Sequence, residues 1–191
     1  MHHWLPHILR AFRKAHPLAQ VETMGASYAE IEGWLRDGEA DCCFCRMPTG
    51  PGIESFPLAR DPLVAIVPQD HRLAQKEQLS LRDLQGENFI RPTHDRFLDV
   101  LPLIRQSGLA FHFRNIVHDY HETISLVASG MGVSVVPLMM ADTYPTLICV
   151  RHLAEKPFRL LGIAVREKGT PALARSFVSI TRELFEQQLL K

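Results

Sequence analysis

The sequence has no excess of basic residues, although such an excess is the simplest mark of a nucleic-acid-binding chain. Its 21 Lys and Arg residues balance 21 Asp and Glu residues, so the formal net charge is zero. Proteins hold duplex DNA largely by neutralising its phosphates with clustered basic side chains. We therefore expect that this chain does not bind nucleic acid by itself.

Long apolar runs are also missing, and cysteine is scarce. No stretch of 18 consecutive apolar residues occurs, so no membrane span is predicted. The first six residues contain no apolar core followed by small residues, as a secretory signal requires. Three of the four cysteines (Cys42, Cys43, Cys45 and Cys149) crowd into one short apolar stretch, which suits reduced thiols better than a disulfide framework. We expect a cytoplasmic protein with no membrane partner.

The remaining composition is that of a globular protein. The chain has 191 residues, of which 46% are hydrophobic, and this is enough for one domain or two small lobes. Helical spacing of apolar residues predicts helices over 5–16, 27–37, 96–106, 122–129 and 171–190. Strands are expected over residues 20–24, 41–46, 63–67, 89–90, 113–117, 133–136 and 159–165. This alternation is typical of α/β proteins, here with two small, mostly parallel sheets.

Residues at helix ends support these expectations. Ser27 and Glu30 have the spacing of a capping box, in which each side chain satisfies a backbone N–H of the first helical turn. Gly38 and Gly132 stand where a helix gives way to a strand and a left-handed residue is favoured. Pro102 should kink or shorten the helix expected over 96–106.

Catalytic and metal-binding patterns have little support. No nucleophile elbow, phosphate-binding loop, dinucleotide fingerprint or paired-carboxylate arrangement is found, so we expect a protein that is not an enzyme and has no cofactor. His118 and His121 are three residues apart, but they straddle a strand-to-helix junction, and polar surface is the better interpretation than a metal site. On a strand Cys43 and Cys45 share a face that Cys42 does not, which favours small buried hydrophobes; a redox-sensing thiol is the alternative.

Four blocks of sequence together resemble the effector-binding (substrate-binding) domain of LysR-type transcription regulators. Leu5-Pro6 with Phe12 and His16-Pro17 is similar to that family's opening helix. Residues 34–41 (WLRDGEAD), 67–74 (VPQDHRLA) and 126–137 (LVASGMGVSVVP) resemble three further family segments, in the family's order and at its separations. The resemblance covers nearly the whole chain.

The resemblance implies a two-lobed, type 2 periplasmic-binding-protein-like α/β fold. Lobe I would be residues 1–68 plus 151–191, and lobe II residues 69–150. A small, anionic effector would bind in the cleft between the lobes, near the carboxyl ends of strands and the starts of helices. The expected ligand-binding residues are Gly25, Ser27, Arg46, Arg91, Thr93, His118 and Pro137. Ser27 is at least as well explained as a helix cap, and Arg46 as a solvated strand end.

The resemblance also implies partners and departures from the family pattern. A homodimer is expected, with Leu5, Ile8 and Phe12 of the first helix as candidate contacts, and DNA would be bound only through an N-terminal helix-turn-helix that this sequence lacks. The family's usual first strand is also missing. We expect a strand from another chain, upstream residues or a rearranged sheet to fill its place between 20–24 and 41–46. The alternative functions are a stand-alone solute-binding protein and an enzyme of related fold, such as an aromatic amino-acid dehydratase.

Overall fold

The computed structural model divides the chain into two compact units. Unit 1 comprises Met1–Ala59 and Leu160–Lys191, and unit 2 comprises Arg60–Arg159. The structure describes residues 4–92, 99–187 and 189. The chain passes from one unit to the other within two strands, β2 (Ile53–Val67) and β8 (Phe158–Arg166). The expected lobe limits, after residue 68 and before residue 151, stay a prediction.

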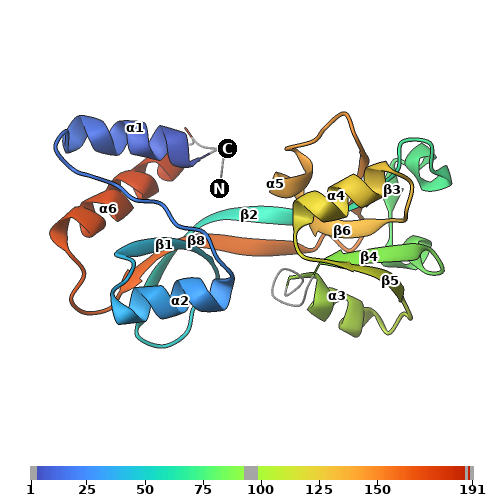
Figure 1. The fold of residues 1–191 in the computed structure, drawn as a ribbon, viewed down its shortest axis with the longest axis horizontal. Helices are drawn as coiled ribbons and strands as arrows, with labels where there is room; N and C mark the ends of the chain where they lie inside the picture. Colours follow the sequence, from blue (N-terminus) through green and yellow to red (C-terminus); the bar gives the residue numbers. More distant parts are fainter. Residues whose placement is uncertain (1–3, 93–98, 188, 190–191) are drawn as a thin grey trace. The chain divides into compact units, whose positions relative to one another are not determined.

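Unit 1 is built on the antiparallel pair of β1 (Cys42–Arg46) and β8, whose register runs from Cys42↔Val165 to Arg46↔Leu161. Its helices are α1 (Leu5–Ala15), α2 (Tyr28–Asp37) and α6 (Ala172–Glu186), and Figure 1 shows α1 beside α6. The two helices join through Phe12 and Phe177, whose rings meet edge to face with centroids 5.2 Å apart. Because Ile8 and Phe12 are buried in this way, they are not available as the dimer contacts expected of them.

The predicted limits of α2 are confirmed, and local chemistry explains both. Ser27 accepts a hydrogen bond from the Glu30 N–H and donates to the Glu30 carboxylate, which closes the capping box. At the other end Gly38 adopts φ 84°, a left-handed conformation that favours glycine. The backbone conformation is the constraint that selects glycine, because the atoms nearest to a Cβ there belong to the tip of the flexible Arg166 side chain, which can move.

The strand expected over 20–24 is wrong. These residues form no regular structure, and Val21 and Met24 are 47% and 53% exposed. An apolar segment becomes a strand only where it can pair and pack, because β propensity largely reflects those contacts. Within the described ranges β1 pairs only with β8, so no strand fills the position between 20–24 and β1.

Unit 2 contains a mixed arrangement of strands. β2 pairs antiparallel with both β6 (Ser134–Pro137) and β7 (Cys149–Leu153), and β7 pairs parallel with β3 (Gln78–Leu79). β4 (Asn88–Pro92) and β5 (His112–Val117) form a parallel pair, and a parallel bridge between Phe89 and Val133 links β4 to the start of β6. The two-lobed α/β class is confirmed, but the pairing is mixed, not mostly parallel, because β2 and β8 pair in the antiparallel sense with their neighbours.

β2 carries the core of unit 2 on both of its faces, since alternate residues of a strand point in opposite directions. Leu63, Ala65 and Val67 pack with α3 (Val100–Ser107), η1 (Arg72–Gln75) and η2 (Leu81–Leu84). Val64 and Ile66 pack with α4 (Tyr120–Ala128) and α5 (Leu138–Ala141). Figure 1 shows α3 on one side of β4 and β6 and α4 on the other. An all-apolar run is therefore required here, as in any strand covered on both faces.

Two helices are shorter than expected. α3 begins at Val100, while residues 93–98 of the expected 96–106 helix lie outside the described residues. Pro102 falls in the first turn of α3, where its missing N–H breaks no helical hydrogen bond. α6 ends at Glu186, not at residue 190.

A buried ionic cluster joins four elements of unit 2. The Arg159 Nε and Nη2 atoms donate to one oxygen of Asp61 at 2.9 and 2.7 Å, and Nη1 lies 3.5 Å from Asp99 at the start of α3. The other Asp61 oxygen accepts the backbone N–H of Met139 in α5. The side chains of Asp61, Asp99 and Arg159 are only 0%, 3% and 11% exposed, so each charge depends on its partners for compensation.

We expect Asp61→Asn to lower the free energy of unfolding by about 3–5 kcal/mol, because it leaves a buried guanidinium without its main counter-charge. Urea unfolding followed by circular dichroism measures the effect. The matched control is Glu32→Gln, which removes the exposed pair with Arg36 in α2 and should cost less than about 0.5 kcal/mol. Similar losses for the two variants would contradict a stabilising role for the cluster.

Candidate functional site

The carboxyl ends of three strands meet at one edge of unit 2. β4 and β5 run parallel with Arg91 opposite Ile116 and Pro92 opposite Val117, so Arg91 and His118 come to the same end of the pair. β6 begins alongside β4, where Val133 exchanges hydrogen bonds with Asn88 and Ile90, and it ends at Pro137. The structure thus brings together three of the expected site residues, and this is the edge at which open α/β sheets bind ligands.

Arg91 is the cation of this edge. Its side chain is half-buried, its Nη1 lies 3.4 Å from the Pro92 carbonyl oxygen, and its guanidinium carbon lies 5.7 Å from the centroid of the Phe113 ring. These contacts limit the guanidinium to few positions, which suits the recognition of a planar anion. Thr93, the next expected contact, lies outside the described residues.

His118 lies at the start of α4, where carboxylates already occupy backbone donors. The His118 N–H donates to Glu122 at 2.7 Å, and Asp119 caps the helix by accepting the Glu122 N–H at 2.8 Å. His121 is directed elsewhere, since its Nδ1 lies 2.8 Å from the Tyr144 hydroxyl. No cluster of three or more potential metal ligands is found in the part of the chain that the structure describes.

The other expected contacts belong to unit 1. Gly25 is exposed in the loop before α2, and Ser27 is half-buried at the N-cap of that helix. The Ser27 hydroxyl already donates to Glu30 at 2.6 Å, so its role as a cap is established. Arg46 is half-buried at the last position of β1.

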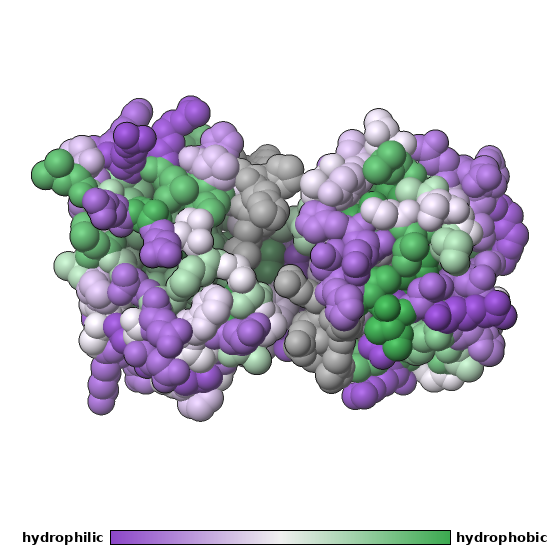
Figure 2. Space-filling model, in the orientation of Figure 1, coloured by the Kyte–Doolittle hydropathy of each residue, from purple (hydrophilic) through white to green (hydrophobic). Residues whose placement is uncertain are grey.

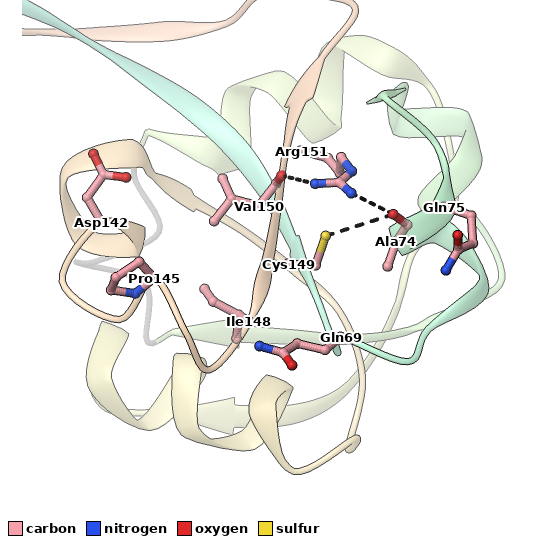
Figure 3. A pocket seen from close by; sticks show the side chains of 9 residues that line it. All are labelled: Gln69, Ala74, Gln75, Asp142, Pro145, Ile148, Cys149, Val150 and Arg151. Atoms are coloured by element: carbon pink, nitrogen blue, oxygen red, sulfur yellow. Dashed lines mark hydrogen bonds between the residues drawn. The ribbon is translucent and has the colours of Figure 1, made fainter.

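A pocket that the sequence did not predict lies elsewhere in unit 2. It has a volume of about 520 Å³, within the range of small-molecule sites, and β7, η1 and the turn after α5 form it (Figure 3). Its lining combines apolar, polar and charged side chains: Gln69, Ala74, Gln75, Asp142, Pro145, Ile148, Cys149, Val150 and Arg151. These residues come from two distant stretches of the chain, 69–75 and 142–151, and follow no motif, so no sequence signal could have grouped them.

Two of the three thiols of unit 1 have raised pKa values. Burial, with a contribution from the Asp41 carboxylate, raises the pKa of the Cys42 thiol to about 11. A hydrogen bond with Cys45, followed by burial, raises the pKa of the Cys43 thiol. Cys45 is 3% exposed and packs with Leu35 and Ala164. The same hydrogen bond lowers the pKa of the Cys45 thiol, but reactive thiols also need exposure to solvent, which Cys45 lacks. Cys45 is therefore a small core residue, and Cys42 and Cys43 are half-buried thiols with raised pKa values.

The two-unit α/β architecture is that of the type 2 periplasmic-binding-protein-like fold. The family model described as the LysR substrate binding domain matches residues 1–186. The chain belongs to this family and is an effector-binding domain of the LysR type.

Curated relatives are transcription regulators and not enzymes. The HTH-type transcriptional regulator CatR of Pseudomonas putida is 33% identical over 186 residues, covering 94% of this chain and 64% of the relative. The Hca operon transcriptional activator HcaR of Escherichia coli (strain K12) is 27% identical, with 94% and 62% covered. The chain thus spans less than two thirds of the length of these relatives.

Solved structures show the same fold. The effector binding domain of QuiR in complex with shikimate has a TM-score of 0.86 at 18% identity, covering 97% of this chain and 91% of that one. The BenM effector binding domain with its effector benzoate has a TM-score of 0.82 at 23% identity, with 98% and 88% covered. In the part of this chain that the structure describes, no helix is long and apolar enough to cross a membrane.

We expect Cys42 to react about 100-fold more slowly with iodoacetamide at pH 8 in the folded protein than in urea. The reason is that only the thiolate reacts, and a pKa of about 11 leaves about 0.1% of the thiol ionised at that pH. Peptide mapping by mass spectrometry gives the rate at each cysteine. Equal rates in the folded and unfolded chains would contradict the raised pKa.

Proposed function

We propose that this chain senses a small organic anion through residues at the carboxyl edge of β4, β5 and β6. The observation that carries the proposal is the convergence of Arg91, His118 and Pro137 at that edge. Arg91 supplies a positive charge on a restrained side chain, and a guanidinium binds a carboxylate through two parallel hydrogen bonds. The further contacts that we propose are Thr93 and, on unit 1, Gly25, Ser27 and Arg46.

The charge at the start of α4 supports an effector that also carries hydrogen-bond donors. Asp119 and Glu122 place two carboxylates beside the His118 backbone, so an anionic group is favoured near Arg91 and disfavoured at the helix start. The ligands named for two structural relatives, benzoate and shikimate, both contain a carboxylate, and shikimate adds hydroxyl donors. A carboxylate with neutral polar substituents fits the described residues best.

We further propose that effector binding controls transcription through a separate DNA-binding domain. The curated relatives include HTH-type regulators that are longer than this chain, and the chain itself has zero net charge. A ligand changes output only by favouring one conformational state over another, so the sensing units would bias the arrangement of the attached domain. We also propose a cytoplasmic location, because bacterial transcription is regulated there.

The proposed function is tested by thermal shift with a panel of organic acids that includes benzoate and shikimate, followed by calorimetry on each hit. We expect at least one acid to bind, and Arg91→Ala to weaken its affinity at least 10-fold, since a charge-assisted pair contributes about 1.5–3 kcal/mol. Arg72→Ala is the matched control, because Arg72 lies in η1 and pairs with Glu87. Equal affinity for the Arg91 variant and the wild type would contradict this site.

We also propose a homodimer, since both units expose large apolar side chains (Figure 2). They include Leu18, Val21 and Met24 on unit 1 and Phe113 and Ile116 of β5 on unit 2. A two-fold axis would let the unit 1 residues of one copy cover the unit 2 residues of another, twice per dimer. Such contacts would bury surface that a monomer leaves in water.

Light scattering after gel filtration tests the dimer. We expect the wild type to elute as a dimer. Ile116 is 59% exposed in one copy and would be buried in the dimer, so Ile116→Asp would bury a charge and should raise the dissociation constant of the dimer at least 10-fold. Leu173→Asp on α6, 51% exposed, is the control and should leave the dimer intact. A wild-type monomer at about 100 µM would refute the proposal.

A further inference from the structure

The unpredicted pocket of unit 2 has a fixed cation in its lining. The Arg151 Nε, Nη1 and Nη2 atoms donate to the carbonyl oxygens of Lys76, Val150 and Ala74 at 2.5, 2.8 and 2.6 Å. Three acceptors from two segments hold the planar group in one orientation. Within the described ranges no carboxylate pairs with Arg151, so its positive charge is not offset locally.

The guanidinium keeps unused donor capacity. It has five N–H groups, and these three hydrogen bonds use one at each nitrogen, which leaves one on Nη1 and one on Nη2. Two N–H groups on adjacent terminal nitrogens match the two oxygens of a carboxylate. Because the orientation is already fixed, binding costs little side-chain entropy.

The rest of the lining defines the other end of the ligand. Figure 3 shows Asp142 and Arg151 on opposite sides of Val150, with Ile148 below them. Pro145, Ile148 and Val150 supply apolar contact between the two charged groups. The Asp142 carboxylate repels a second anion but accepts a hydrogen bond from a hydroxyl or amine. The lining thus changes from cationic through apolar to anionic.

We propose that this pocket is a second ligand site, which binds a small organic carboxylate with an apolar body and a hydrogen-bond donor at its far end. The carboxylate would lie against Arg151, and the donor would face Asp142. The proposal is independent of the effector site, since the pocket shares no residue with the set Arg91, His118 and Pro137. Cys149, half-buried in the lining, serves as a reporter of occupancy.

The probe is 4-hydroxybenzoate, titrated to about 10 mM into the ¹⁵N-labelled protein and followed by NMR. We expect saturable shifts of the Gln69, Gln75, Cys149 and Arg151 amides. Arg151→Gln should weaken binding at least 10-fold, whereas Arg72→Gln, which changes a neighbouring arginine outside the lining, should leave it unchanged. The uncharged 4-hydroxybenzamide should bind at least 10-fold more weakly, and benzoate, which has no donor, several-fold more weakly.

A second measurement uses the unaltered protein, so it stands even if Arg151→Gln disturbs folding. Bound 4-hydroxybenzoate should slow alkylation of Cys149 by iodoacetamide at least 5-fold at saturation. Arg91→Ala should preserve both the amide shifts and the protection, which separates this pocket from the effector site. The proposal is overturned if no saturable shift of these amides occurs, if the benzamide binds as tightly as the acid, or if Cys149 stays unprotected at saturation.

Discussion

The ion pair between Asp61 and Arg159 is the interaction on which the organisation of unit 2 depends. Asp61 lies in β2 and Arg159 in β8, the two strands through which the chain passes from one unit to the other. Since Asp61 is fully buried, its charge must be compensated at this point, and Arg159 and the Met139 N–H supply that compensation. The pair thereby fixes β2 relative to β8 and to the start of α5, while Asp99 ties in α3. A shift of any one of these elements would break at least one of these contacts.

This constraint lies close in sequence to the edge proposed to bind the effector. β4 ends at Pro92, directly after Arg91, and α3 begins at Val100, directly after Asp99, so residues 93–98 connect the proposed anion contact to the buried cluster. On the other side, β6 ends at Pro137, two residues before Met139. A ligand that alters either connection therefore acts on elements attached to Asp61 and Arg159. An energetic coupling of this kind would need packed or hydrogen-bonded groups, and on the described side of each connection Asp99 and Met139 contact Arg159 and Asp61.

Local patterns predicted most elements of the fold, because their causes are local. The capping box at Ser27 and the left-handed Gly38 limit α2 whatever surrounds it, and the apolar run before Pro68 fits a strand covered on both faces. The prediction of a strand at Val21 is wrong because a strand also needs a neighbouring strand, which a local pattern does not reveal. For the same reason no local pattern joins Asp61 to Arg159, since the two residues are 98 positions apart.

The same distinction between local and long-range causes applies to the candidate sites. Arg91 and His118 could be proposed because strand ends are readable from sequence and parallel neighbours bring such ends together. The pocket that contains Arg151 and Asp142 could not be proposed from the sequence, because it exists only once β7, η1 and the turn after α5 pack together. The short helix α5 extends between the two places: Pro137 precedes it and Asp142 follows it, while Met139 within it is held by Asp61. If ligands occupy both places, any shift of α5 caused by one changes the affinity for the other, and thermodynamic linkage requires that effect to be equal in both directions.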